Sequence, residues 1–145
     1  MLPTLQVGDR LVVDKLPWLA HSIRRGDIIV FHRAPHDTDL QYPILVKRVI
    51  GLPNQTISSK GDTIYIDGKP ISEPWLAAMN STPTCPQADF DIPRTHIGKG
   101  QYFVMGDCRG NSSDSRFWGT VPTKNIIGRV FVVIWRHNHP WFHWF

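Results

Sequence analysis

The stretch Tyr42-Pro43-Ile44-Leu45-Val46-Lys47-Arg48-Val49-Ile50-Gly51-Leu52-Pro53 indicates how this chain folds. Its apolar, largely β-branched run is closed at both ends by Pro or Gly, which predicts a largely buried strand. Lys47 lies inside this run. Burying an ammonium without a partner is costly, and a buried lysine responds by losing its proton near neutral pH. Lys47 is therefore a candidate general base; the alternative is a lysine on the solvent face, with its stem along apolar surface.

Short strands and turns predominate in the rest of the chain. The 145 residues include twelve Pro and eleven Gly, which indicates many turns and little helix. Asp67-Gly68 predicts a tight hairpin, and only Leu16–Ile23 could form a short helix. Residues 74–94 are rich in turn formers and predict a loop-dominated excursion. The sequence therefore predicts an all-β domain with a small additional lobe. The predicted strands are Arg10–Asp14, Asp27–His32, Ile44–Ile50, Thr63–Asp67, Tyr102–Met105 and Arg129–Trp135.

The net charge of +4 and the isoelectric point of about 9.3 suit either nucleic acid or an anionic membrane surface as a partner. The basic residues are scattered, with Arg24-Arg25 and Lys47-Arg48 as the only adjacent pairs, so no nucleic-acid partner is expected. The segment from Trp135 to Phe145 mixes aromatic, His and Arg residues, as membrane–water interfaces favour. A tail packed on the core and a disordered end are the alternatives. No apolar run reaches the roughly 18–20 residues that span a bilayer.

Cys85 and Cys108 are the only two cysteines. They show no CxxC spacing, so no metal site and no cofactor are expected. A disulfide between them and two separate core thiols are both compatible with the sequence. His137, His139 and His143 have no neighbouring acid or Cys that would complete a ligand set, and surface positions are expected for them.

A second dense motif runs Gly106-Asp107-Cys108-Arg109-Gly110-Asn111-Ser112-Ser113-Asp114-Ser115-Arg116-Phe117-Trp118-Gly119. One interpretation is a loop of Asx and Ser turns in which Asp114 and Arg116 form a local salt bridge. The functional interpretation is that a hydroxyl, such as that of Ser112, binds the amine of Lys47 and orients its lone pair.

Together these motifs resemble bacterial type I signal peptidases, which are membrane-anchored serine proteases with a Ser/Lys dyad. Four segments match in order and cover most of the chain. They are Met1–Leu5, Arg25–Phe31, Lys47–Pro53 and Gly106–Gly119, the last followed by Val121-Pro122. The resemblance implies twisted antiparallel sheets of the signal-peptidase type. We expect a catalytic β core of residues 1–57 and 99–145 and a small loop-rich lobe of residues 58–98, inserted between the third and fourth segments.

The resemblance also implies a role for each matching residue. Lys47 matches the general base, and Ser112 matches the serine that orients it. Asp114 with Arg116, and Asp107 with Arg48, match two structural pairs. Positions that line shallow pockets for small substrate side chains are matched by Met1, Leu5, Ile44, Leu45 and Val46. The implied substrates are signal peptides of preproteins, bound as an added strand and cut after Ala-x-Ala.

The nucleophilic serine of the family directly precedes the residue matched by Met1, and the sequence contains no such serine. We therefore expect a truncated and catalytically incomplete chain, whose full-length form is anchored in a bacterial-type membrane with the catalytic domain outside the cytoplasm. A monomer is the family expectation. The alternatives are a non-catalytic peptide-binding or membrane-associated β module of the same descent and, ranked lower, a self-cleaving Ser/Lys domain of the repressor type. Cys108 and Asn54-Gln55 also depart from the family pattern, which usually has Asn and Gly-Asp there.

Overall fold

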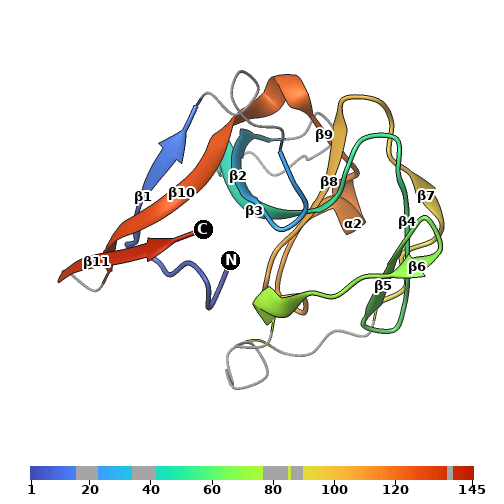
Figure 1. The fold of residues 1–145 in the computed structure, drawn as a ribbon, viewed down its shortest axis with the longest axis horizontal. Helices are drawn as coiled ribbons and strands as arrows, with labels where there is room; N and C mark the ends of the chain where they lie inside the picture. Colours follow the sequence, from blue (N-terminus) through green and yellow to red (C-terminus); the bar gives the residue numbers. More distant parts are fainter. Residues whose placement is uncertain (16–22, 34–41, 77–84, 86–89, 137–138) are drawn as a thin grey trace.

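Antiparallel strands dominate the computed structural model of the protein, which describes residues 1–15, 23–33, 42–76, 85, 90–136 and 139–145 (Figure 1). They form a seven-stranded sheet in the order β1-β10-β2-β3-β8-β9, with β11 also paired to β10, and a four-stranded sheet in the order β6-β5-β4-β7. The all-β prediction is therefore confirmed. Figure 1 shows the small sheet at the opposite end of the molecule from β1 and β11.

The large sheet consists of β1 (Arg10–Asp14), β2 (Ile28–His32), β3 (Ile44–Gly51), β8 (Gln101–Met105), β9 (Val121–Pro122), β10 (Ile126–Arg136) and β11 (His139–Trp144). The small sheet consists of β4 (Thr56–Lys60), β5 (Thr63–Ile66), β6 (Lys69–Pro70) and β7 (Thr95–His96). Three short helical segments accompany them: η1 (Pro74–Leu76), α2 (Ser115–Trp118) and η3 (Thr123–Asn125).

The six predicted strands are all present. Five of them begin and end within about one residue of the predicted bounds. The exception is the predicted strand at Arg129–Trp135, which is part of the longer β10. The hairpin turn is also confirmed, because Asp67 and Gly68 both have positive φ, 51° and 79°, and join β5 to β6. The predicted helix at Leu16–Ile23 falls almost entirely on residues outside the described ranges.

The first four residues of β2, Ile28 to Phe31, are apolar and buried on both faces of the strand, whereas His32 at its end is exposed. Ile28 and Val30 pack with Leu5 and β10 residues on one side, whereas Ile29 and Phe31 pack with Trp118 on the other. The neighbouring β3 changes along its length, from an exposed Ile44 to a fully buried end at Arg48–Gly51. The prediction of a buried strand is therefore correct for its second half.

A shared apolar cluster joins the two sheets. It packs the end of β3 and β8 against β4, β5 and the residues that flank β7, through Ile50, Ile57, Ile64, Ile66, Ile92, Ile97, Phe103 and Met105. A Cβ on Gly51 would lie 2.2 Å from Cδ1 of Ile97, so the approach of the sheets requires glycine there. The expected lobe boundaries near residues 57 and 98 stay a prediction.

The C-terminal segment is a strand and not a free tail. Residues of β11 pair with Val132–Arg136 of β10, and Trp144 packs edge-on against Phe131 with ring centroids 5.0 Å apart. This matches the alternative in which the tail folds back on the body of the protein. Trp141, Phe142 and Trp144 nevertheless keep large exposed surfaces.

Candidate active site

The side chains of Lys47 and Ser112 are in contact although the residues are 65 positions apart in the sequence. Lys47 lies on β3, next to the point where that strand becomes buried, and Ser112 lies in the loop between β8 and α2. The Lys47 Nζ donates a hydrogen bond to the Ser112 Oγ at 2.8 Å. The fold therefore brings the predicted base and its predicted orienting serine into direct contact.

Gly106 makes this contact sterically possible. A Cβ at this position would lie 2.2 Å from the Ser112 Oγ and 3.5 Å from the Lys47 Nζ. Its backbone N–H donates to the Asp114 carboxylate at 3.0 Å, which fixes the start of the loop against its end. A glycine is thus required here because of the close approach of side chains.

Asp114 organises the loop that carries Ser112. Its side chain is fully buried, caps α2, and accepts from both the Nε and the Nη2 of Arg116 at 2.8 Å. The same Arg116 Nη2 donates to the backbone carbonyls of Arg109 and Ser112. The predicted Asp114–Arg116 pair is therefore a buried brace that ties the backbone around Ser112, and burial with several partners makes it more than a surface ion pair.

The predicted Asp107–Arg48 pair is also present. The Arg48 Nε and Nη2 each donate to Asp107 at 2.8 Å, and the Arg48 Nη1 donates to the Gly26 carbonyl at 2.7 Å. The Thr4 hydroxyl donates to the second oxygen of the same carboxylate at 2.5 Å. The Trp75 ring lies 5.1 Å from the Arg48 guanidinium carbon. Asp107 therefore links the N-terminal segment to β3, immediately beside Lys47.

The α-amino group of Met1 lies close enough to Lys47 for their charges to interact. Burial lowers the pKa of this amino group, repulsion from Lys47 lowers it further, and Asp107 opposes the change. The charge of Lys47 therefore acts on the first residue of the chain; the substrate-binding role expected for Met1 stays a prediction.

The predicted substrate-binding residues differ in how far they are exposed to solvent. Ile44 is 48% exposed, Leu45, Val46 and Met1 are half-buried, and Leu5 packs into the core beside Ile28. Val46 pairs with β2, whereas β8 pairs only with the later part of β3, from Arg48 onward. In the described part of the chain, no strand pairs with the other edge of β3 at residues 44–46.

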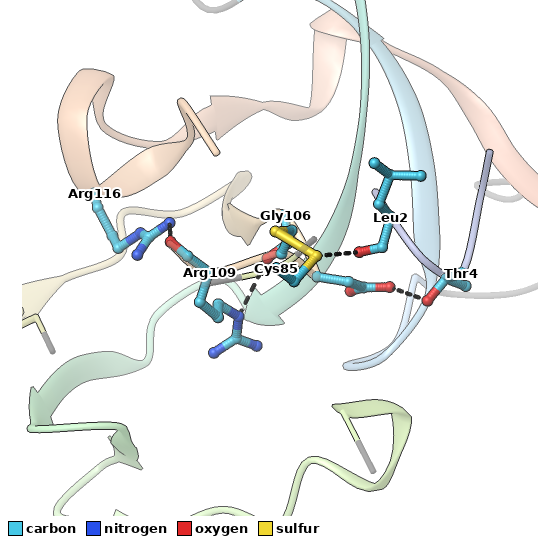
Figure 2. The surroundings of a disulfide bond; sticks show 8 residues. Leu2, Thr4, Cys85, Gly106, Arg109 and Arg116 are labelled. Atoms are coloured by element: carbon cyan, nitrogen blue, oxygen red, sulfur yellow. Dashed lines mark hydrogen bonds between the residues drawn. A yellow bond between two sulfur atoms is a disulfide. The ribbon is translucent and has the colours of Figure 1, made fainter. Parts of the chain in front are cut away.

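Cys85 and Cys108 form a disulfide, which resolves the two alternatives left open by the sequence. The Cys85 Sγ lies 3.7 Å from the Leu2 carbonyl, and Figure 2 shows the bond beside Leu2 and Gly106. The disulfide therefore ties Cys85 to the loop that carries Ser112 and places it next to the Leu2 carbonyl.

Several site contacts have no signal in the local sequence. Arg109 forms a bidentate ion pair with Glu73, in which the Nη1–Oε2 distance is 3.0 Å, and its Nε donates to the Gly106 carbonyl. Thr4 and Gly106 lie in the matched segments, and their positions in those segments could have indicated them. Glu73 and Trp75 lie in the turn-rich region between motifs, where neither spacing nor periodicity distinguishes them.

The family model described as "Signal peptidase, peptidase S26" matches residues 1–135 of the chain. The chain belongs to this family. Among its relatives, the signal peptidase I of Leptolyngbya laminosa is 42% identical over 142 residues, which are 95% of this chain and 66% of the relative. The protein named signal peptidase I V of Bacillus subtilis is 39% identical over 90% of this chain and 77% of its own length.

A solved member of the signal peptidase family has the same fold. The crystal structure of a signal peptidase I from Enterococcus faecalis matches with a TM-score of 0.59 and 34% identity, over 74% of this chain and 95% of that one. The chain spans 66, 64 and 59% of the length of three cyanobacterial signal peptidase relatives. In the described ranges, no helix is long and apolar enough to cross a membrane, and no three His, Cys, Asp or Glu residues gather as a metal site.

Proposed function

We propose that this signal peptidase domain removes signal peptides from preproteins by Ser/Lys chemistry, with Lys47 as the general base. The observation that carries the proposal is the 2.8 Å hydrogen bond between the Lys47 Nζ and the Ser112 Oγ. Ser112 is the acceptor of this bond, so it holds the amine in one direction, and the Asp114–Arg116 brace holds Ser112. Such a held amine is suited to proton transfer once it is neutral.

The nucleophile in this proposal is a serine joined to the Met1 nitrogen. The Thr4–Asp107 and Asp107–Arg48 hydrogen bonds join the Met1–Leu5 turn to the residue after Lys47, and repulsion from Lys47 lowers the pKa of the Met1 amino group; both support this placement of the serine. Lys47 removes the serine proton as the serine oxygen attacks the scissile carbonyl. The resulting ammonium then protonates the leaving amine, and the neutral amine activates the water that hydrolyses the acyl-enzyme.

The substrate is proposed to add a strand to the edge of β3 at residues 44–46. The exposed Ile44 and the half-buried Leu45 and Val46 line this edge, which has no strand partner among the described residues. Main-chain hydrogen bonds would give affinity, and alternate substrate side chains would face the protein. The apolar side chains at this edge suit apolar substrate residues, and the proposed cleavage position is after Ala-x-Ala.

The test compares four proteins on a preprotein whose signal ends in Ala-x-Ala. The chain with Ser placed before Met1 should cleave it, and the same chain with Ala there should not. Lys47→Ala in the active form should lower kcat by roughly 10²–10⁴-fold or more, the range for loss of a general base. Lys60→Ala is the matched control, because Lys60 is an exposed residue at the end of β4. Full cleavage by the Lys47→Ala protein would disprove the assignment.

An anionic membrane surface is the proposed second partner. The net charge is +4, and β11 exposes Trp141, Phe142 and Trp144, which are the residue types that occupy membrane interfaces. The disulfide suits a domain outside the cytoplasm. Vesicles with and without anionic lipid test this: binding that is equal for the parent and for a Trp141→Ser/Trp144→Ser variant would remove β11 from the interface. Sedimentation should give a monomer in solution.

A further inference from the structure

Hydrogen bonds join Arg136, at the end of β10, to Asp9 and Thr4 of the N-terminal segment. The Arg136 Nε and Nη2 donate to the two carboxylate oxygens of Asp9 at 3.0 and 2.6 Å, and the Nη2 also donates to the Thr4 carbonyl at 2.9 Å. The side chains of Arg136 and Asp9 are only 17% and 3% exposed. A planar guanidinium that binds both oxygens of one carboxylate is held in a single orientation. The orientation of its hydrogen bond to the Thr4 carbonyl is therefore fixed as well.

Thr4 is held from two sides by this arrangement. Its carbonyl is bound by Arg136, and its hydroxyl is bound by Asp107, which in turn holds Arg48 on β3. Next to it, Leu5 is buried in the core, and the Leu5 N–H donates to the Met1 carbonyl at 3.0 Å. The orientation of the Met1–Leu5 turn is therefore set by contacts at both the backbone and the side chain of Thr4.

We infer that Arg136 and Asp9 form a positioning clamp that sets where the residue before Met1 lies relative to Lys47. This inference rests on the proposed function, since it assigns a role in placing the proposed nucleophile. The family model ends at residue 135, so Arg136 lies beyond the matched residues. The Trp141 ring of β11 lies 5.9 Å from the Arg136 guanidinium carbon, so β11 contributes to the environment of the clamp.

Loss of the clamp should act on kcat and leave KM nearly unchanged. The proposed substrate edge is on β3 and the Lys47–Ser112 contact is held by the loop at residues 106–116, and neither touches Arg136 directly. Only the N-terminal segment is released. Because a misplacement of about 1 Å between reacting groups can reduce a rate by roughly 10²-fold, a kcat loss of about 10–100-fold is expected.

The kinetic test uses the protein in its full natural length and a preprotein that ends its signal in Ala-x-Ala. Arg136→Ala and Asp9→Asn should each lower kcat by about 10–100-fold with KM within about threefold of the parent. Arg136→Lys retains the charge but not the fork, and should recover part of the loss. Arg10→Ala is the matched control, because Arg10 also stacks on a tryptophan, Trp135, at 5.3 Å. Variants with parental kcat, an effect on KM alone, or an equal loss in Arg10→Ala would each overturn the clamp.

Hydrogen exchange separates failure of the clamp from failure of the proposed function. In the 145-residue chain, Arg136→Lys and Asp9→Asn should speed exchange of the Leu5 amide at least tenfold and leave the amide of Ile29, in the core, unchanged. If the full-length parent cleaves no preprotein, the proposed function is wrong, and faster Leu5 exchange still supports a clamp on the segment. If the parent cleaves and Leu5 exchange stays at the parental rate, the clamp is rejected.

Discussion

The substitution Gly106→Ala tests the geometry of the Lys47 site with the smallest possible change. The added Cβ would lie 2.2 Å from the Ser112 Oγ and 2.7 Å from its Cβ. Ordinary contact begins at 3.4 Å, so Ser112 must move by roughly 1.2 Å. The added Cβ lies 2.2 Å from the Ser112 Oγ and 3.5 Å from the Lys47 Nζ, and these two atoms are 2.8 Å apart, so the movement is nearly at right angles to their hydrogen bond. It therefore changes the direction of the bond and displaces the Ser112 Oγ from its position beside the amine.

Two consequences follow for Gly106→Ala. The active form should lose about 10²-fold in kcat, because a displacement of about 1 Å at reacting groups has that effect. The free energy of unfolding should fall by about 1–3 kcal/mol, the usual result of overpacking. Preprotein cleavage measures the first, and denaturant unfolding followed by tryptophan fluorescence measures the second. The two effects share one cause, so they should appear together.

The control for this prediction is Gly98→Ala. Its added Cβ meets the nearest atom, the Gln101 Cγ, at 3.5 Å, which is ordinary contact, so activity and stability should stay near the parental values. Removing the obstacle gives a further check: in a Ser112→Gly background, Gly106→Ala should cost clearly less stability than in the parent. A Gly106→Ala enzyme with kcat within threefold of the parent would show that the close approach does not set the position of Ser112.

Three further outcomes are expected. Asp107→Asn leaves the buried Arg48 without its anion and should lower the free energy of unfolding by about 3–5 kcal/mol in denaturant titrations. Burial raises the pKa of Tyr102 above its usual 10.0, so above pH 10 the unfolded chain loses this proton first and the free energy of unfolding falls as pH rises. In Tyr102→Phe this fall should be shallower when unfolding is measured between pH 9 and 11. An unchanged slope would contradict the prediction. Replacing Cys85 and Cys108 by Ser should cost about 3 kcal/mol for their 23-residue separation, whereas reductant should lower the melting temperature of the parent only.

Local sequence patterns predicted the strands and turns that are determined by neighbouring residues. The apolar run of β2 and the Asp67-Gly68 turn were found because each is determined by neighbouring residues. β4 (Thr56–Lys60) was missed because its sequence, Thr-Ile-Ser-Ser-Lys, has one buried apolar residue and little alternation. β11 was not predicted because its sequence, with Pro140, two histidines and two tryptophans, shows no alternation of polar and apolar residues. Pairing with β10 supplies its stability.

The site was predicted as a set of motifs but not as a network. The two motifs that contain Lys47 and Ser112 identified both residues, and the resemblance supplied the pairs Asp114–Arg116 and Asp107–Arg48, which the structure brings together. The contacts of Arg136 with Asp9 span 127 positions, and no local pattern reports such a distance. Single-sequence reasoning finds residue types suited to a chemistry, whereas the partners that hold them come from tertiary packing.

β10 pairs with three other strands, and this position affects the order in which the protein folds. β10 pairs with β1, β2 and β11, and its partner Asp14 is separated from Arg129 by more than a hundred residues. Contacts of such long range are slow to form and come late in folding. The first segment, including Thr4, therefore lacks its contacts with β10 until late in folding. During that time β1 and β2 are without this partner, and their unpaired edges are exposed to aggregation.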